Sequence, residues 1–233
     1  MLKYLGADIS RDGDCVIVNK STLQAKPISV PGDISSAAFL MAAAAILPGS
    51  HAKITGVGVN PSRTGIIHVL RRMGADITLH NERTSCGEAV ADIEIRHSPL
   101  KATTISGAEI PTLIDEIPAI AAVALFADGE TVIKDAEELR VKETDRIQAV
   151  VEEFGKFFEK SPITAQEDGM IIIGGHPLKA AKVSSRGDHR LAMSLSVLAM
   201  AVGTEQGETE IENAKSADIS FPGFYELLPC VKM

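Results

Sequence analysis

Three segments of this chain repeat one plan, and this repeat constrains the fold more than any other feature of the sequence. Each segment begins with an aspartate, continues as an apolar helix rich in small residues, turns at a glycine and closes with a short β-branched strand. The segments begin at Asp33, Asp115 and Asp188, and their closing strands are expected at 52–55, 131–133 and 209–211. Because one such unit cannot bury its apolar surface alone, the three units are expected to stack into one domain.

A second, amphipathic helix follows the strand of each of the first two segments. Its apolar residues recur at i, i+3, i+4 and i+7 and therefore share one helix face: Ile66, Val69, Leu70 and Met73, then Ile147, Val150, Val151 and Phe154. Each of these helices is expected to be followed by a hairpin-like pair of strands, at 76–79 with 91–95 and at 163–165 with 170–173. The unit is therefore α-β-α-β-β.

The two ends of the chain depart from this unit. The third segment is shortened and is expected to end in a helix over about 221–228. Residues 1–29 are expected to hold the end of a helix over 1–6 and a strand over 16–19, and a piece of this size cannot bury enough surface to fold alone. We therefore predict an α/β domain of three pseudo-symmetric repeats over residues 30–233, preceded by the remnant of another unit.

The charge and the cysteines limit the possible functions. The 233 residues carry 23 Lys and Arg against 31 Asp and Glu, and a net charge of −8 does not suit binding to nucleic acid. Three cysteines without CxxC spacing argue against a disulfide framework or a zinc site. The longest apolar run, 37–47, is shorter than the about 18 residues of a membrane span, and no signal peptide is recognisable. We expect a cytoplasmic protein without membrane contact.

The helices that lead the three segments are apolar nearly all round, so they are expected to be buried on every side. Their N-termini would then emerge at the surface, where free N–H groups and the helix dipole attract anions. On spacing alone, N-capping is the favoured interpretation of Asp33, Asp115 and Asp188. His189 and Arg190 alter this for the third helix, because a cation at a positive helix end is unfavourable unless an anion binds there.

A second charged motif, RVKETDR, spans 140–146 at the expected start of the second amphipathic helix. Glu143 lies four residues before Ile147 and Arg146 four before Val150, so both extend the core-facing stripe. The simplest interpretation is an exposed network with Glu143 and Arg146 as an i,i+3 pair, worth only about 0.3 kcal/mol. The excess of three cations over two anions instead favours a phosphate or carboxylate ligand.

Four motifs together resemble the C-terminal half of the 5-enolpyruvylshikimate-3-phosphate synthase family: LRVKETDR over 139–146, IDEIP over 114–118, DHRLAM over 188–193 and the Phe221–Pro222 pair. The resemblance implies an enolpyruvyl transferase-like fold, an inside-out α/β barrel of three repeats. It also implies transfer of the enolpyruvyl group of phosphoenolpyruvate to the 5-hydroxyl of shikimate 3-phosphate, with release of phosphate and without a metal or organic cofactor.

The resemblance also implies the roles of six residues. Asp115 would deprotonate the attacking hydroxyl, and Glu143 would transfer a proton to and from the methylene carbon. Substrate binding is implied for the basic residues Lys142, Arg146, His189 and Arg190, of which His189 would lie beside the phosphate.

Two departures from the family pattern affect the functional prediction. Ile219 stands where the family pattern has a lysine, so one phosphate contact is expected to be missing or replaced. The chain is also about half as long as the family, so the N-terminal half is an expected partner and the chain alone is expected to be inactive. Two alternatives remain: a non-catalytic anion-binding module, and the UDP-N-acetylglucosamine enolpyruvyl transferase of the same fold.

Overall fold

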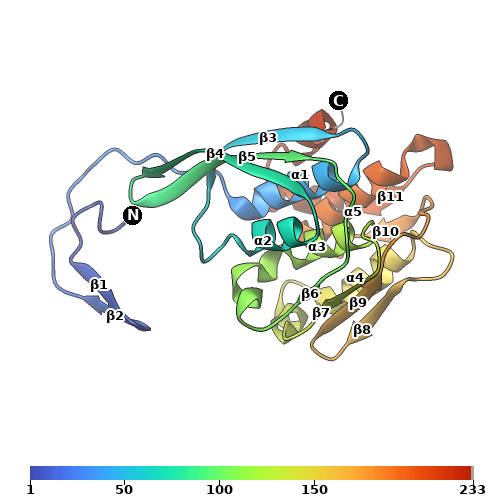
Figure 1. The fold of residues 1–233 in the computed structure, drawn as a ribbon, viewed down its shortest axis with the longest axis horizontal. Coiled ribbons are helices and arrows are strands. Elements are labelled where there is room, and N and C mark those ends of the chain that lie inside the picture. The colour runs from blue at the N-terminus through green and yellow to red at the C-terminus, as the bar shows by residue number, and fades with distance from the viewer. Residues whose placement is uncertain (232–233) are drawn as a thin grey trace.

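Three buried helices form the centre of the molecule in the computed structural model, which describes residues 1–231. They are α1 (Ile34–Ile46), α3 (Ile117–Ala124) and α5 (His189–Val202), and each packs against the other two. Alanines fill much of their surface, which lets the helix axes approach closely while burying every face (Figure 1). The predicted all-round burial of these helices is confirmed, because nearly all of their apolar residues are buried.

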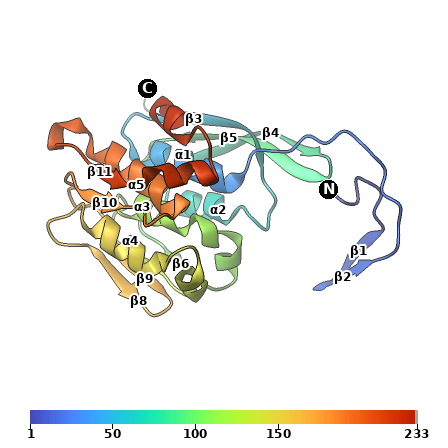
Figure 2. The same ribbon diagram turned by 180° about the vertical axis from the view of Figure 1, so that it is seen from behind.

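The first sheet covers α1 and has the order β3-β5-β4, with both pairs antiparallel. Its strands are β3 (His51–Gly58), β4 (Asp76–Ser85) and β5 (Glu88–Arg96), and α2 (Gly65–Arg72) joins β3 to β4. The hairpin was predicted at the right place but too short. Its distal half, 80–85, is largely exposed and polar, so it lacks the alternation that marks a strand. The β4–β5 end projects past the helices (Figure 2).

The second sheet has the order β6-β7-β9-β8 and packs against α3 and α4. Its strands are β6 (Thr104–Ile105), β7 (Glu130–Ile133), β8 (Ile163–Gln166) and β9 (Gly169–Ile173), and α4 spans Arg146–Gly155. A parallel pair, β10 (Lys182–Ser184) with β11 (Glu210–Glu212), lies beside α4 and α5. The second amphipathic helix, expected to start at the RVKETDR motif, begins at Arg146, the last residue of that motif, and the preceding residue Asp145 caps it.

Short 3-10 helices connect these elements. They are η1 (Gly107–Thr112), η2 (Ile114–Glu116), η3 (Glu137–Val141), η4 (Thr204–Gln206), η5 (Ala214–Ile219) and η6 (Leu228–Val231). The predicted C-terminal helix is wrong in extent, because α6 covers only Phe224–Leu227 before η6 follows. Its Phe224 is buried against Phe39 of α1, so the C-terminal end anchors to the same core.

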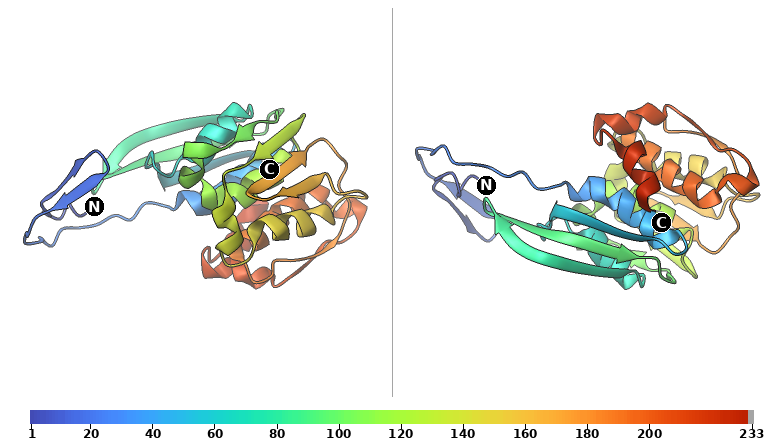
Figure 3. Two further views of the ribbon diagram at one scale, coloured as in Figure 1. Left: turned by 90° about the horizontal axis from the view of Figure 1, so that it is seen from below. Right: turned by 90° about the horizontal axis from the view of Figure 1, so that it is seen from above.

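The first 29 residues extend away from the core helices (Figure 3). They contain an antiparallel hairpin of β1 (Ile9–Asp12) and β2 (Cys15–Val18), in which β1 was not predicted, and residues 1–6 form turns and not the end of a helix. The apolar side chains of β2 are exposed, with 64% exposure at Val16. The segment contacts the β4–β5 turn, where the N-terminal amine lies 3.0 Å from Glu88.

Candidate active site

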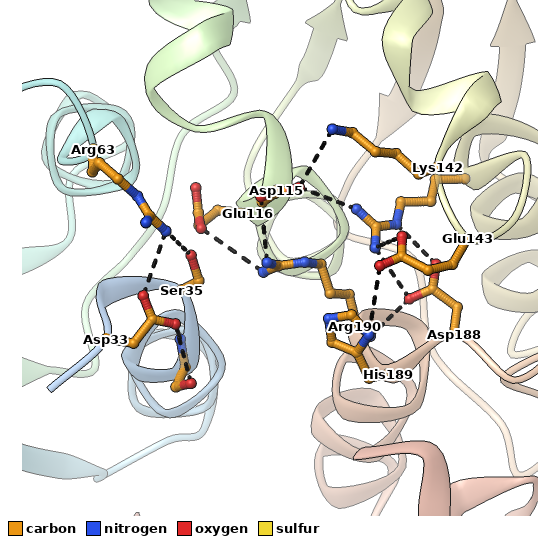
Figure 4. Close-up of polar contacts among 12 residues, drawn as sticks. Asp33, Ser35, Arg63, Asp115, Glu116, Lys142, Glu143, Asp188, His189 and Arg190 are labelled. Carbon is orange, nitrogen blue, oxygen red and sulfur yellow. Dashed lines mark hydrogen bonds and ion pairs between the residues drawn. The ribbon is translucent and has the colours of Figure 1, made fainter. Parts of the chain in front are cut away.

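The two predicted motifs meet where η2, the start of α4 and the start of α5 converge (Figure 4). Seven side chains lie together there, and we call them the site cluster: Asp115, Lys142, Glu143, Arg146, Asp188, His189 and Arg190. All six predicted site residues therefore belong to one cluster, although they come from parts of the sequence up to 75 residues apart, since 190 − 115 = 75.

Arg146 is the centre of the cluster and is buried, with 1% of its side chain exposed. Its guanidinium donates to three carboxylates: to Glu143 Oε2 at 2.6 Å, to Asp188 Oδ2 at 2.9 Å and to Asp115 Oδ1 at 3.3 Å. A buried guanidinium requires such partners, because an unpaired charge in the interior is strongly destabilising. The i,i+3 pair of Glu143 and Arg146 is thus confirmed, but the expected exposure is wrong for Arg146, because only Glu143 is exposed.

Asp188 is the buried counter-ion of Arg146 and also the N-cap of α5. Its Oδ1 accepts from the backbone N–H groups of Arg190 at 2.8 Å and Leu191 at 3.3 Å. Burial alone would raise the pKa of Asp188, but Arg146 and these two N–H groups keep that pKa below its usual value. Asp188 is therefore ionised at neutral pH and ties α4 to α5.

Asp33 and Asp188 cap their helices as predicted, but Asp115 does not. Asp33 accepts from the backbone N–H of Ser36 at 3.0 Å. Asp115 lies inside η2, and α3 begins two residues later with Glu116 in the cap position and no side-chain capping bond. The Asp115 carboxylate is consequently available to the site cluster, where it is about one-third exposed.

Arg190 and Lys142 lie farther from Asp115 than Arg146 does. The Nη2 atom of Arg190 lies 3.4 Å from Asp115 Oδ2, and Lys142 Nζ lies 3.9 Å from Asp115 Oδ1. Lys142 also pairs with Glu138 at 2.6 Å, on the solvent side. Both cations are mostly buried yet lack a close bidentate partner, so they are the groups best placed to contact an anionic ligand.

Glu143 and His189 form the remaining pair of the site cluster. Glu143 is half-exposed, and its Oε1 lies 3.8 Å from His189 Nδ1. Burial and the neighbouring Arg190 lower the pKa of His189, so its imidazole is neutral at neutral pH. His189 therefore offers a neutral hydrogen-bonding group beside the Arg190 cation.

The RVKETDR motif does not bring all three of its cations to the cluster. Arg140 turns away from the cluster: it donates to Asp145 at 2.8 Å and to two carbonyl oxygens of the β8–β9 turn. The cluster itself holds Lys142, Arg146 and Arg190 against three carboxylates, so its formal charges balance when His189 is neutral.

Three further polar residues extend the cluster toward α1 and were not predicted. Glu116 Oε1 lies 3.9 Å from Arg190 Nη1, and Arg63 Nη2 donates to Ser35 Oγ at 2.7 Å. Arg63 also pairs with Asp33 at 3.4 Å, next to a cavity of about 310 Å³. The sequence offered one signal for these residues: Asp33 was expected to cap α1, and Ser35 lies in the first turn of that helix.

Within 1–231, no group of three or more His, Cys, Asp or Glu side chains could hold a metal ion. Over the same residues, no helix is both long and apolar enough to cross a bilayer. What the cluster offers instead is proton-accepting carboxylates held next to cations, the arrangement that acid–base chemistry on an anionic substrate requires.

Comparison with known proteins shows extensive similarity to one family. Its model, EPSP synthase (3-phosphoshikimate 1-carboxyvinyltransferase), matches residues 1–228. A 3-phosphoshikimate 1-carboxyvinyltransferase of Brevibacillus brevis is 51% identical over 98% of this chain and 53% of its own length. That of Gloeobacter violaceus is 48% identical over 100% of this chain and 53% of its own. The chain thus spans about half the length of the curated relatives it matches.

Solved structures agree with this similarity. An EPSP synthase of Acinetobacter baumannii superposes with a TM-score of 0.89 and 38% identity, over 99% of this chain and 53% of that one. The enolpyruvyl transferase NikO of Streptomyces tendae, at 20% identity, has a TM-score of 0.72 over 99% of this chain and 51% of that one, which shows a shared mixed α/β fold. With the family model matched over residues 1–228 and about half of its residues identical to those of relatives, the chain belongs to the EPSP synthase family.

Proposed function

We propose that this chain supplies the C-terminal part of a 3-phosphoshikimate 1-carboxyvinyltransferase, which transfers the enolpyruvyl group of phosphoenolpyruvate to the 5-hydroxyl of shikimate 3-phosphate. The observation that carries the proposal is the buried Arg146, which joins Asp115 and Glu143 to the N-terminus of α5. It holds two partly exposed carboxylates at fixed positions beside the cations of Lys142 and Arg190.

Substrate binding is assigned to the cations according to their partners. Arg190 and Lys142 exchange their long contacts with Asp115 for the phosphate and carboxylate of phosphoenolpyruvate. Arg146 is held by Asp188 and contributes positive charge from a fixed position. His189, neutral at the first turn of α5, donates a hydrogen bond to the phosphate. Ile219, which is 74% exposed, supplies no charge to this group.

The two carboxylates carry the proton transfers. Asp115 accepts the proton of the 5-hydroxyl while the hydroxyl oxygen of the substrate bonds to C2 of phosphoenolpyruvate. Glu143 delivers a proton to C3, and the two steps together give a tetrahedral intermediate. Phosphate then leaves with the proton held by Asp115, and return of a C3 proton to Glu143 restores the double bond and both carboxyl groups. Because Glu143 is half-exposed in the chain alone, closure of a second domain over it supplies the burial that this role needs.

The chain's organisation follows from the same proposal. Residues 30–233 form the C-terminal domain, with three α/β units arranged inside-out around α1, α3 and α5. Residues 1–29 are the end of the N-terminal domain and the hinge, and their exposed hairpin packs against that domain. The N-terminal half of the enzyme is therefore the partner, and no cofactor takes part.

Reconstitution of the enzyme from two halves tests the proposal. The N-terminal half of a relative is mixed with this chain, and phosphate release is measured with both substrates present. The mixture should be active and each half alone inactive, and Asp115→Asn, Glu143→Gln and Arg190→Gln should each lower the rate of the mixture by at least about 100-fold. Arg83→Gln removes a surface arginine of β4 and is the matched control.

Three outcomes would contradict the proposal. Full activity of the lone chain would show that the site does not need a second half. Binding of phosphoenolpyruvate without turnover in the mixture would favour a non-catalytic anion-binding module, and turnover with UDP-N-acetylglucosamine as the acceptor would favour the other enolpyruvyl transfer reaction.

A further inference from the structure

Glu116 is a buried carboxyl that the proposed reaction does not use. It is the last residue of η2, with 3% exposure, and its Oε1 has no hydrogen-bond partner among residues 1–231. Its position joins two parts of the molecule: Ser35 of α1 lies on one side, and Arg190 of α5 lies on the other, with Nη1 at 3.9 Å (Figure 4).

The charged groups that face Glu116 come from each element packed around it. They are Asp115 on η2, Arg190 on α5 and Arg63 in the segment before α2, whose own partners are Ser35 and Asp33 on the α1 side. Arg190 therefore lies between two carboxyl groups, Asp115 at 3.4 Å and Glu116 at 3.9 Å. Only Asp115 is accessible to a ligand, because Glu116 is covered.

We propose that Glu116 is a positioning residue for Arg190: its buried carboxyl holds the guanidinium beside Asp115, and its charge determines how strongly Arg190 attracts an anion. The positioning part stands on the contacts alone, whereas the anion-binding part rests on the proposed function. Glu116 does not touch the substrate, since its side chain is enclosed by α1, η2 and Arg190.

The direction of the effect follows from the charge of the carboxyl. Burial raises the pKa of Glu116, against a hydrogen bond from Ser35 and the charge of Arg190, which lower it. While Glu116 is neutral, Asp115 is the single counter-ion of Arg190. Once Glu116 ionises, Arg190 has two counter-ions and an incoming anion must compete with both. Affinity for an anion should therefore fall as the pH rises through the pKa of Glu116.

The positioning part is tested by NMR on the lone chain, without ligand. The side-chain Nε–Hε resonance of Arg190, assigned with Arg190→Lys, is followed from about pH 4.5 to about pH 9. Wild type should show a pH step in this resonance, and Glu116→Gln, which keeps the size of the side chain, should remove it. His189 also titrates beside Arg190, so the comparison is repeated in a His189→Gln background. Glu109→Gln, which changes a glutamate paired with Arg72, is the matched control and should leave the step in place.

The anion-binding part is tested with inorganic phosphate on the same samples. The ratio of wild-type to Glu116→Gln affinity cancels the titration of phosphate itself. This ratio should be near one at the acid end and fall about tenfold at the alkaline end, which corresponds to one pKa unit of coupling. Glu116→Ala, which removes the side chain that holds Arg190, should bind more weakly than Glu116→Gln at every pH.

An Arg190 step that is identical in wild type and Glu116→Gln would overturn the inference, as would equal Arg190 resonances and phosphate affinities in Glu116→Ala and Glu116→Gln. If the step depends on Glu116 but phosphate binds to none of the proteins, the positioning role holds and the anion-binding function fails. The two proposals are thus separated by the same experiment.

Discussion

Asp188→Asn isolates the charge of the buried ion pair from the capping of α5. Asparagine caps helices about as well as aspartate, so the substitution keeps the bonds to the N–H groups of Arg190 and Leu191. It removes the negative charge that lies 2.9 Å from Arg146 Nε in a place where neither side chain is exposed by more than 1%. The expected result is therefore a loss of folding stability with an intact helix.

The size of this loss can be worked out from the remaining partners. Removing one member of a buried ion pair costs about 3–5 kcal/mol, because the other charge stays buried without compensation. Arg146 retains Glu143 at 2.6 Å and Asp115 at 3.3 Å, both partly exposed, so the lower end applies. We expect the free energy of unfolding to fall by about 3 kcal/mol at neutral pH.

Asp33→Asn is the matched control, since Asp33 has the same place at the start of α1. Its partner Arg63 lies at 3.4 Å with half of each side chain exposed, so the loss should stay below about 1 kcal/mol. Urea denaturation of both variants and wild type, followed by circular dichroism, gives the two free energies. A difference between the variants of less than about 1 kcal/mol would refute the assignment of Asp188 as an essential buried counter-ion.

Three further predictions concern stability. Arg146 holds the pKa of Asp188 below that of the unfolded chain, which is about 3.9. The stabilisation by ionised Asp188 is therefore complete above that value and is lost as the pH falls through the pKa of the folded state. Asp188→Asn should flatten this acid limb of a profile of folding stability against pH. Glu153→Gln removes a buried carboxylate that ties α4 to the segment before α5. In urea denaturation, the free energy of unfolding should fall by about 2–4 kcal/mol in this variant and by less than about 1 kcal/mol in Glu152→Gln, whose carboxylate is more exposed. Gly169→Ala would place a Cβ 1.9 Å from a backbone oxygen of β7 and should lower the thermal midpoint by several degrees, whereas Gly32→Ala meets its nearest atom at 3.6 Å and should not.

The elements that could be predicted from the sequence are those whose burial is uniform. The helix at 117–124 is apolar on every face, so no arrangement other than a central one satisfies it. The distal part of β4 could not be predicted, because residues 80–85 are held by pairing with β5 and not by burial of an apolar face. In the hairpin at 9–18, the apolar run of β2 was predicted as a strand over 16–19, whereas β1 is polar and mostly exposed, which leaves no apolar pattern for a sequence to show.

The sequence motifs predicted which residues belong to the site cluster, but not which of them pair across distant parts of the sequence. Motif resemblance singled out Arg146 and Arg190, while their partners depend on contacts between residues far apart in the sequence. Arg146 and Asp188 are 42 residues apart, and nothing in their local sequence distinguishes a counter-ion from a helix cap. Glu116 was missed for the same reason: its burial depends on α1, which lies some 80 residues earlier in the chain.

Asp115 differs from Asp33 and Asp188 because a 3-10 turn separates it from the start of its helix. Asp33, Asp115 and Asp188 begin three similar segments, yet two of them spend a carboxylate oxygen on helix capping and the third does not. In the second segment a 3-10 turn delays the helix to Ile117, and the proline at the following position has no N–H that needs a cap. The carboxylate of Asp115 thereby keeps both oxygens for Arg146 and Arg190. A base must be free to accept a proton, so the uncapped aspartate is the one suited to the role that the proposed function gives it, and the 3-10 turn is what leaves its carboxylate uncapped.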